Sequence, residues 1–200
     1  MKRNPTSVSA SRLVTALLLG ALPAAVSAQT IRFKSFESVS PNEKVRIVSK
    51  CDGQRQACNV SAHAGGSAVE IGPRDYPSGP GIRWVNLDTA AVDFACGEGC
   101  RTTWFFNPRL GRSAPYRHVL AVDGVRMRVA VDDPAREEID VLPIGTDENA
   151  TPSCRVPRRT LYGGTADTAA RRVVFDSEGN LKLHDGSGAV IPIDRRSGTC

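Results

Sequence analysis

The sequence has few aromatic residues, few histidines and no long apolar run, and each shortage excludes a class of structure or function. Aromatic residues make up 6% of the chain, and only three of its residues are histidine. The longest apolar run, Leu13–Val26, has 14 residues and includes Pro23, whereas a membrane-spanning helix needs about 20 apolar residues. A glycine-rich phosphate loop and a dinucleotide-binding fingerprint are both missing. We therefore expect no membrane span downstream of this run, no cofactor and no metal ion.

Apolar residues at helical spacing are also scarce. Downstream of residue 28, no segment sustains them over three helical turns. The 18 glycines and 13 prolines indicate many turns and short elements. The sequence therefore predicts an all-β fold with low helix content, in which antiparallel meanders form a sandwich, a barrel or a propeller-like stack.

The first 28 residues have the three parts of a cleavable signal peptide. Lys2 and Arg3 make a basic start, the apolar run Leu13–Val26 follows, and small residues precede Gln29. The pattern predicts cleavage between Ala28 and Gln29 and export to the periplasm or the extracellular space. The predicted mature chain is thus a single β-rich domain.

Removal of this segment changes the charge of the protein. It holds three basic residues and no acidic one, so the mature chain 29–200 has 23 basic against 21 acidic residues, a net charge of +2. Nucleic-acid-binding domains usually carry a strong basic excess, so we expect no nucleic-acid partner. The mature chain is long enough for one core, and the alternative is a main domain with a C-terminal subdomain of residues 154–200.

The clearest strand pattern is a hairpin near residue 120. Val119–Val122 and Val125–Val131 flank Asp123-Gly124, a pair that suits a two-residue turn because both positions tolerate positive φ. In the second strand, valine or methionine alternates with polar or small residues, which is typical of one buried face. A similar meander pattern runs from 171 to 193.

All six cysteines follow the predicted cleavage site, and an even number in an oxidising compartment predicts three disulfides. They are Cys51, Cys58, Cys96, Cys100, Cys154 and Cys200. Local spacing pairs the first with the second and the third with the fourth across hairpin ends. Elimination then pairs Cys154 with Cys200, which would close the C-terminal subdomain. A redox pair is more often Cys-x-x-Cys at a helix N-terminus, and a zinc site needs further ligands, so we prefer structural disulfides.

The three histidines carry the enzymatic alternative, a small secreted hydrolase that uses His63, His118 or His184. Such a site requires a histidine between a nucleophilic serine and a carboxylate. His184 precedes Asp185, but neighbours on a strand point to opposite faces of the sheet. The sequence therefore assigns no catalytic residue.

Arginine is the most distinctive surface feature, because only four of the 23 basic residues of the mature chain are lysine. Arg101, Arg109 and Arg112 lie close in sequence to Trp104 and Tyr116. Guanidinium groups bind carboxylates or phosphates through paired hydrogen bonds and stack on aromatic rings. These five residues are the predicted anion- or partner-binding site.

The composition, cysteines and arginines favour an exported, disulfide-stabilised binding protein, comparable in kind to inhibitors or immunity proteins. Its expected partner is an extracytoplasmic protein or an anionic polymer of the cell envelope. The hydrolase and a purely structural envelope component are the alternatives. The sequence itself does not identify a ligand.

Overall fold

A computed structural model describes residues 35–55, 57–145, 150–157, 172–185 and 187–191. Every regular element in these ranges is a β-strand, and every strand pairing is antiparallel. The prediction of an all-β, antiparallel fold is therefore confirmed. The predicted signal peptide lies outside the described residues and stays a prediction.

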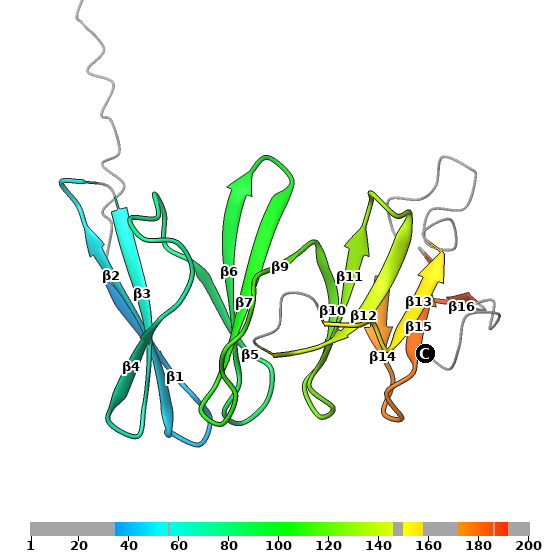
Figure 1. Ribbon diagram of the computed structural model, residues 1–200, viewed down its shortest axis with the longest axis horizontal. Coiled ribbons are helices and arrows are strands. Elements are labelled where there is room, and N and C mark those ends of the chain that lie inside the picture. Colours follow the sequence, from blue (N-terminus) through cyan, green and yellow to red (C-terminus); the bar gives the residue numbers. More distant parts are fainter. Residues whose placement is uncertain (1–34, 56, 146–149, 158–171, 186, 192–200) are drawn as a thin grey trace, which may run out of the picture. The chain divides into compact units, whose positions relative to one another are not determined.

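The strands form four sheets that follow one another along the chain (Figure 1). The first sheet contains β1 (Phe36–Val39), β2 (Val45–Asp52), β3 (Ala57–Ala64) and β4 (Ser67–Glu70). The second contains β5 (Gly81–Trp84), β6 (Ala90–Gly97), β7 (Cys100–Asn107), β8 (Gly111–Arg112) and β9 (Tyr116–Arg117). The third contains β10 (Val119–Asp123), β11 (Arg128–Asp133), β12 (Glu138–Pro143) and β13 (Cys154–Pro157). The fourth contains β14 (Arg172–Phe175), β15 (Leu181–His184) and β16 (Val190–Ile191).

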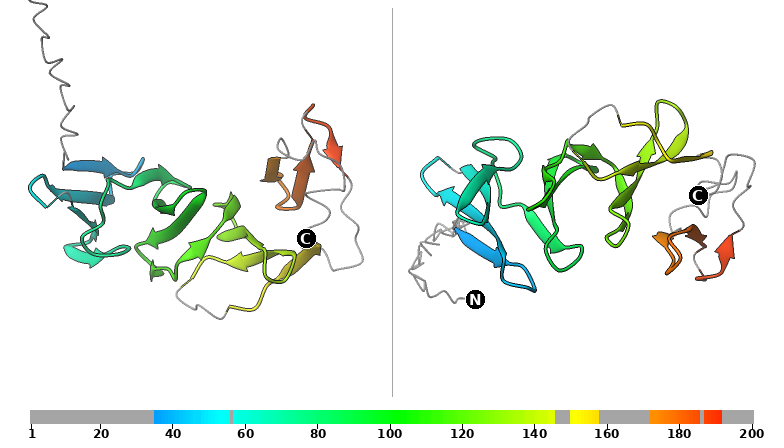
Figure 2. Two further views of the ribbon diagram at one scale, coloured as in Figure 1. Left: turned by 90° about the horizontal axis from the view of Figure 1, so that it is seen from above. Right: turned by 60° about the horizontal axis from the view of Figure 1, so that its bottom comes forward.

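The first, third and fourth sheets are meanders in which each strand pairs with the next one along the chain. Figure 2 gives two further views of the four sheets. In the second sheet, β8 and β9 both pair with β7, each covering a different part of its edge. A closed barrel is not formed by the described strands. Of the three architectures predicted, a stack of meanders describes the sheets best.

Three apolar cores join the sheets in chain order. The core between the first two sheets includes Ile47 and Phe94, and the core between the second and third includes Phe105 and Val131. The core between the third and fourth sheets includes Ile139. The second and third sheets are therefore apolar on both faces. Continuous apolar runs in β6 and β7 are the sequence sign of such double burial.

The hairpin of β10 and β11 differs from its predicted form. Its turn has four residues, Gly124 to Met127, and β11 begins only at Arg128. The Asp123 carboxylate accepts the backbone N–H groups of Val125 (3.2 Å) and Arg126 (3.0 Å), and Met127 takes the positive φ of 51°. The predicted two-residue turn is thus wrong, and Val125, which was expected in the core, is 87% exposed. An aspartate side chain can cap the longer turn, which the Asp-Gly pattern does not reveal.

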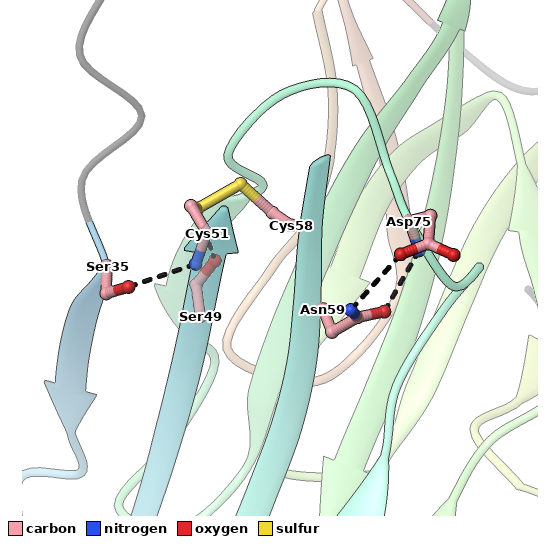
Figure 3. Close-up of a disulfide and its surroundings, with 6 residues drawn as sticks. All are labelled: Ser35, Ser49, Cys51, Cys58, Asn59 and Asp75. Carbon is pink, nitrogen blue, oxygen red and sulfur yellow. Dashed lines mark hydrogen bonds between the residues drawn. A yellow bond between two sulfur atoms is a disulfide. The ribbon is translucent and has the colours of Figure 1, made fainter. Parts of the chain in front are cut away.

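Two of the predicted disulfides are confirmed. Cys51 bonds to Cys58 across the β2–β3 hairpin, and Cys96 bonds to Cys100 across the β6–β7 hairpin (Figure 3 shows the first). Cys154 is also disulfide-bonded. Its predicted partner, Cys200, lies outside the described residues, so that pairing stays a prediction.

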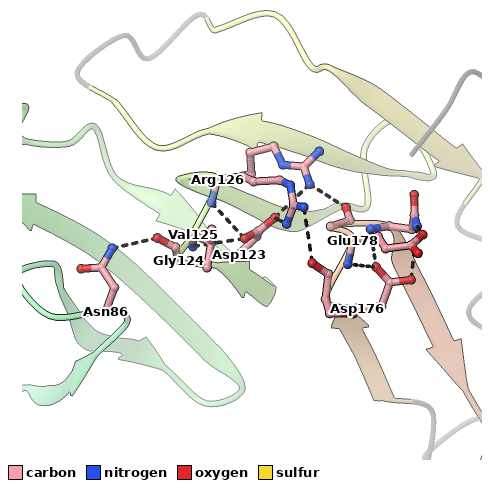
Figure 4. Close-up of polar contacts among 11 residues, drawn as sticks. Asn86, Asp123, Gly124, Val125, Arg126, Asp176 and Glu178 are labelled. Carbon is pink, nitrogen blue, oxygen red and sulfur yellow. Dashed lines mark hydrogen bonds and ion pairs between the residues drawn. The ribbon is translucent and has the colours of Figure 1, made fainter.

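Polar contacts at the turns add to the apolar cores (Figure 4). Asn86, between β5 and β6, donates from its side-chain amide to the carbonyl oxygen of Gly124 at 2.7 Å. Arg128 donates to Asp123 at 2.9 Å and to the carbonyl oxygen of Gly179, between β14 and β15, at 2.6 Å. Turns of the second, third and fourth sheets are therefore linked through the β10–β11 hairpin.

The boundary of the expected C-terminal subdomain falls inside a sheet. Residues 154–157 form β13, the last strand of the third sheet, and pair with β12. In the described part of the chain, no helix has the length and apolarity to cross a membrane.

Candidate functional site

A cleft of about 600 Å³ opens between the second and third sheets. One wall is Ala114–His118, the segment around β9, and the other comes from β11, β12, β13 and the turn between β11 and β12. Its acidic and basic lining residues are Arg117, His118, Asp132, Asp133, Arg136, Asp140 and Arg155. Prolines, alanines, Val131 and Leu142 provide the apolar parts of the walls.

Asp140 is buried, whereas the other charged side chains that line this cleft are partly or fully exposed. In the ladders of the third sheet it stands opposite Val131 on β11 and Arg155 on β13, so all three point to the face that meets the second sheet. Val131 packs into the core between the second and third sheets and also lines the cleft, together with Asp140 and Arg155. Only 5% of Asp140 is exposed, although it is an aspartate on a strand.

Two half-exposed arginines cover the buried carboxylate. Arg136 Nη1 lies 3.5 Å from Asp140 Oδ2, and Arg155 Nε lies 3.5 Å from Asp140 Oδ1. The side chains of Arg136 and Arg155 are 57% and 48% exposed. Arg136 also pairs with Asp133 at 3.3 Å, and Arg155 with Glu138 at 3.7 Å. Each guanidinium is thus held between two carboxylates and still faces the cleft.

The pKa of Asp140 is raised above its ordinary value. Burial is the largest cause, and the charges of Glu138 and Asp133 raise it further, whereas Arg155 and Arg136 lower it. Asp140 Oδ1 is buried and has no hydrogen-bond partner in the described structure, since the contact with Arg155 is an ion pair only. A buried carboxyl with a raised pKa in a cleft is a physical mark of a functional site.

A second, smaller hollow of about 480 Å³ lies beside β8. Its walls include the Trp104 indole, the Arg112 side chain and the rings of Pro73 and Pro115. Trp104 and Arg112 share a face, because Arg112 pairs with Phe106, two residues beyond Trp104 on β7. Two of the five residues predicted as an anion- or partner-binding site are therefore brought together here.

The other three predicted site residues lie elsewhere. Arg101 is exposed near the start of β7, and Arg109 is exposed in the loop that follows this strand. Tyr116 lines the large cleft but is buried, and its hydroxyl donates to the Pro143 carbonyl oxygen at 2.8 Å and accepts the Gly145 N–H at 3.2 Å. Its polar group therefore holds the loop after β12 in place.

The three histidines lie on different parts of the chain. His63 contacts Ser61 at 2.9 Å on β3, exposed His118 lines the cleft, and His184 Nδ1 lies 2.9 Å from the Gly188 carbonyl oxygen. Within the described ranges, none of them pairs with a carboxylate. The same ranges contain no cluster of three or more His, Cys, Asp or Glu residues that could hold a metal ion.

One residue of the sequence, Asp140, indicates the cleft, although the pattern of charges around it does not. The composition of residues 132–138 is typical of a solvated polar connector between two strands, and it gives no indication that Arg136 lines a cleft. Asp140, however, interrupts the apolar strand between Ile139 and Val141. A single aspartate inside an apolar strand needs a partner when buried, and Arg155 supplies one from the next strand.

Comparison with known protein families finds no match, and neither does comparison with curated proteins. Among solved structures, the β-propeller domain of the Trilobed protease from Pyrococcus furiosus is similar to this chain. The similarity covers 78% of this chain and 69% of the other, with 13% sequence identity and a TM-score of 0.35. These values are too low to transfer an architecture or a function.

Proposed function

We propose that the protein is an exported binding protein that holds a hydroxyl-rich ligand, such as a sugar, in the cleft around Asp140. The observation that carries this proposal is the buried Asp140 carboxylate beneath the half-exposed guanidinium groups of Arg136 and Arg155. Positive and negative side chains alternate on the same surface, so hydrogen-bond donors and acceptors are both available to a ligand.

The charge balance of the cleft argues against a simple anion site. Each arginine already has two carboxylate neighbours, and Asp132 also lines the cleft. A phosphate or carboxylate would have to compete with these groups and would be repelled by them. A hydroxyl group both donates and accepts, so it can bind to arginine and aspartate without displacing either. The apolar wall segments suit the C–H surfaces of a sugar ring.

The fixed geometry of the arginines supports binding with little loss of side-chain entropy. Each guanidinium is planar and is positioned by two carboxylates, so its rotamers are restricted before a ligand arrives. Asp140 is itself fixed in the middle of a strand. Preorganised groups of this kind lower the entropic cost of binding.

Export is part of the proposal and rests on the signal-peptide pattern and the disulfides. Disulfides persist in oxidising compartments, and two are formed within the described chain. A hydrolase is less well supported, because the histidines and their neighbours do not form a site of nucleophile, base and carboxylate in the described residues. We therefore place the ligand at the arginine–aspartate cleft and assign it no bond-breaking step.

The proposal is tested with an array of neutral and acidic oligosaccharides, followed by calorimetry on the sugars retained. Arg155→Ala should weaken binding about tenfold or more, the effect of losing a hydrogen bond to a charged group. Arg46→Ala is the matched control, because Arg46 is an exposed, ion-paired arginine on the first sheet. Binding of no sugar, or equal losses in both variants, would contradict the proposal.

A further inference from the structure

The two hollows share a wall. Ala114 and Pro115 line the large cleft on one side and the Trp104–Arg112 hollow on the other. This pair of residues is therefore a ridge at the edge of the second sheet, with the cleft on the face toward the third sheet and the hollow on the face toward the first sheet. A ligand longer than one sugar could lie in both.

The ridge is fixed by hydrogen bonds. Ser113 donates its backbone N–H to the Phe105 carbonyl oxygen at 2.8 Å, and its hydroxyl oxygen accepts the Phe105 N–H at 2.8 Å. Ala114 donates its N–H to the Gly145 carbonyl oxygen at 3.0 Å. The connector between β8 and β9 is thus attached to the second sheet and to the loop after β12. The spacing of the two hollows is consequently a fixed property of the fold.

The smaller hollow differs from the cleft in its electrostatics. Arg112 donates to the Glu70 carbonyl oxygen at 3.3 Å but forms no ion pair with any carboxylate of the described chain. Among the described residues, no carboxylate neutralises its positive charge, which is therefore available to an anion. The cleft, in contrast, holds arginines that are already paired.

The Trp104 indole adds a stacking surface to this charge. The ring is half-buried, packs edge-on against Phe94 at a centroid distance of 5.3 Å, and lines the hollow. No described residue accepts a hydrogen bond from its Nε1. The face of an aromatic ring attracts the weakly positive C–H groups of a sugar, and a free indole N–H can donate to its oxygens.

We propose that the two hollows form one continuous site for a linear polysaccharide that alternates neutral and carboxylate-bearing sugars. The inference rests on the proposed function for the neutral sugar, which would lie in the cleft over Asp140. The next, carboxylate-bearing sugar would cross the Ala114–Pro115 ridge, stack on Trp104 and pair with Arg112.

A length series of unsulfated hyaluronan oligosaccharides, which alternate glucuronate and N-acetylglucosamine, tests the inference. Short fragments should bind the cleft alone. Fragments that reach both hollows should bind about tenfold or more tightly, because the second contact becomes intramolecular. Chitin oligosaccharides of the same lengths carry no carboxylate and should show no such increase.

Variants locate the two contacts separately. Arg112→Ala should remove the additional affinity of the long hyaluronan fragments and leave the affinity of the short fragments unchanged. Arg155→Ala should weaken the binding of both short and long fragments. Arg74→Ala is a control at the neighbouring surface, since Arg74 is exposed and already paired with Glu70 at 2.8 Å. The chain has only two tryptophans, so Trp104→Phe should also abolish the ligand-induced change in tryptophan fluorescence while Trp84 remains.

Each result has a defined meaning. A gain with fragment length that Arg112→Ala removes supports the continuous site. Short fragments that bind without a gain in the longer ones would overturn the continuous site and leave the proposed function intact. Absence of binding by all fragments and by chitin oligosaccharides would contradict both proposals. Equal affinity for polyglutamate would overturn the choice of a polysaccharide, because an acidic peptide would then suffice.

Discussion

Asp123 and Asp140 are two buried aspartates of the third sheet, and their surroundings shift their pKa values in opposite directions. Burial raises the pKa of Asp123, but hydrogen bonds from Arg128 and from the Arg126 backbone, with the charges of both arginines, outweigh it and lower the net pKa. For Asp140 burial prevails, and the pKa is raised. The two carboxylates differ in their hydrogen bonds. Asp123 accepts hydrogen bonds from two backbone N–H groups and from Arg128, whereas the nearest guanidinium nitrogens of Arg136 and Arg155 lie 3.5 Å from the Asp140 oxygens and form ion pairs only.

Asp123→Asn should destabilise the protein near neutral pH by about 1–2 kcal/mol, because the amide keeps the turn acceptor but loses the charged contacts with Arg126 and Arg128. Because the pKa of Asp123 is lowered in the folded state, its ionised carboxylate stabilises the folded protein at pH values above the ordinary pKa of 3.8. This stabilisation is lost as the pH falls. The difference in unfolding free energy between wild type and variant should therefore shrink on acidification. Urea titrations at several pH values measure it, and a pH-independent difference would contradict this assignment.

Asp140→Asn should show the opposite slope. A carboxyl with a raised pKa favours the folded state when protonated, and this contribution is lost as the pH rises above 3.8. The variant should therefore become more stable relative to wild type as the pH rises above 3.8. The same urea titrations apply, and parallel pH profiles for wild type and variant would refute the raised pKa. In the variant, Arg136 and Arg155 also lose their shared carboxylate, so ligand binding in the cleft should weaken.

At the scale of the elements, the two hairpin disulfides should differ in their contribution to stability. Chain entropy assigns about 2 kcal/mol to each, because both loops are short. Cys58 is fully buried and pairs through its backbone with Tyr76, whereas Cys96 is exposed. Replacing Cys51 and Cys58 by alanine should therefore cost about 1 kcal/mol more than replacing Cys96 and Cys100, because it also leaves a small cavity. Chemical unfolding of the two double variants makes the comparison, and equal costs would count against it.

Strand positions were more predictable than turn geometry. Alternation of apolar and polar residues indicates which face of a strand is buried, and in β15 Leu181 and Leu183 lie in the core while Lys182 and His184 are only partly buried. In β11, Ala130 between the two valines is buried as well, because the third sheet packs against a core on each face. The turn after Asp123 was mispredicted because its length depends on a side-chain cap and on Met127 at positive φ, neither of which follows from residue type alone. The disulfide hairpins were predictable, since two cysteines a few residues apart can meet only across a turn.

At the scale of the molecule, the sequence predicted meanders but not the cleft between them. Trp104 and Arg112 are eight residues apart and belong to neighbouring strands, so a local pattern could group them. The cleft combines the Ala114–His118 segment with Arg136, Asp140 and Arg155 from three places in the third sheet. Its formation depends on which sheet faces meet, and periodicity within one strand contains no information about that.

The contact between the second and third sheets can be tested at Gly124. A Cβ atom added there would lie 2.5 Å from the backbone oxygen of Val85, which follows β5 in the second sheet. A backbone atom cannot move aside as a side chain can, so Gly124→Ala should force the hairpin of β10 and β11 away from the second sheet. Overpacking of this kind costs about 1–3 kcal/mol.

Gly53→Ala is the matched control for this prediction. Gly53 also follows an aspartate in a turn and, like Gly124, has no positive φ, but a Cβ atom there would meet nothing within 4 Å. Its replacement should change the unfolding free energy by less than about 0.5 kcal/mol. Urea midpoints of the two variants separate the effects. Equal midpoints would mean that the Gly124–Val85 contact does not hold these sheets together, whereas a selective loss at Gly124 would show that close backbone packing between the sheets supports the wall of the cleft.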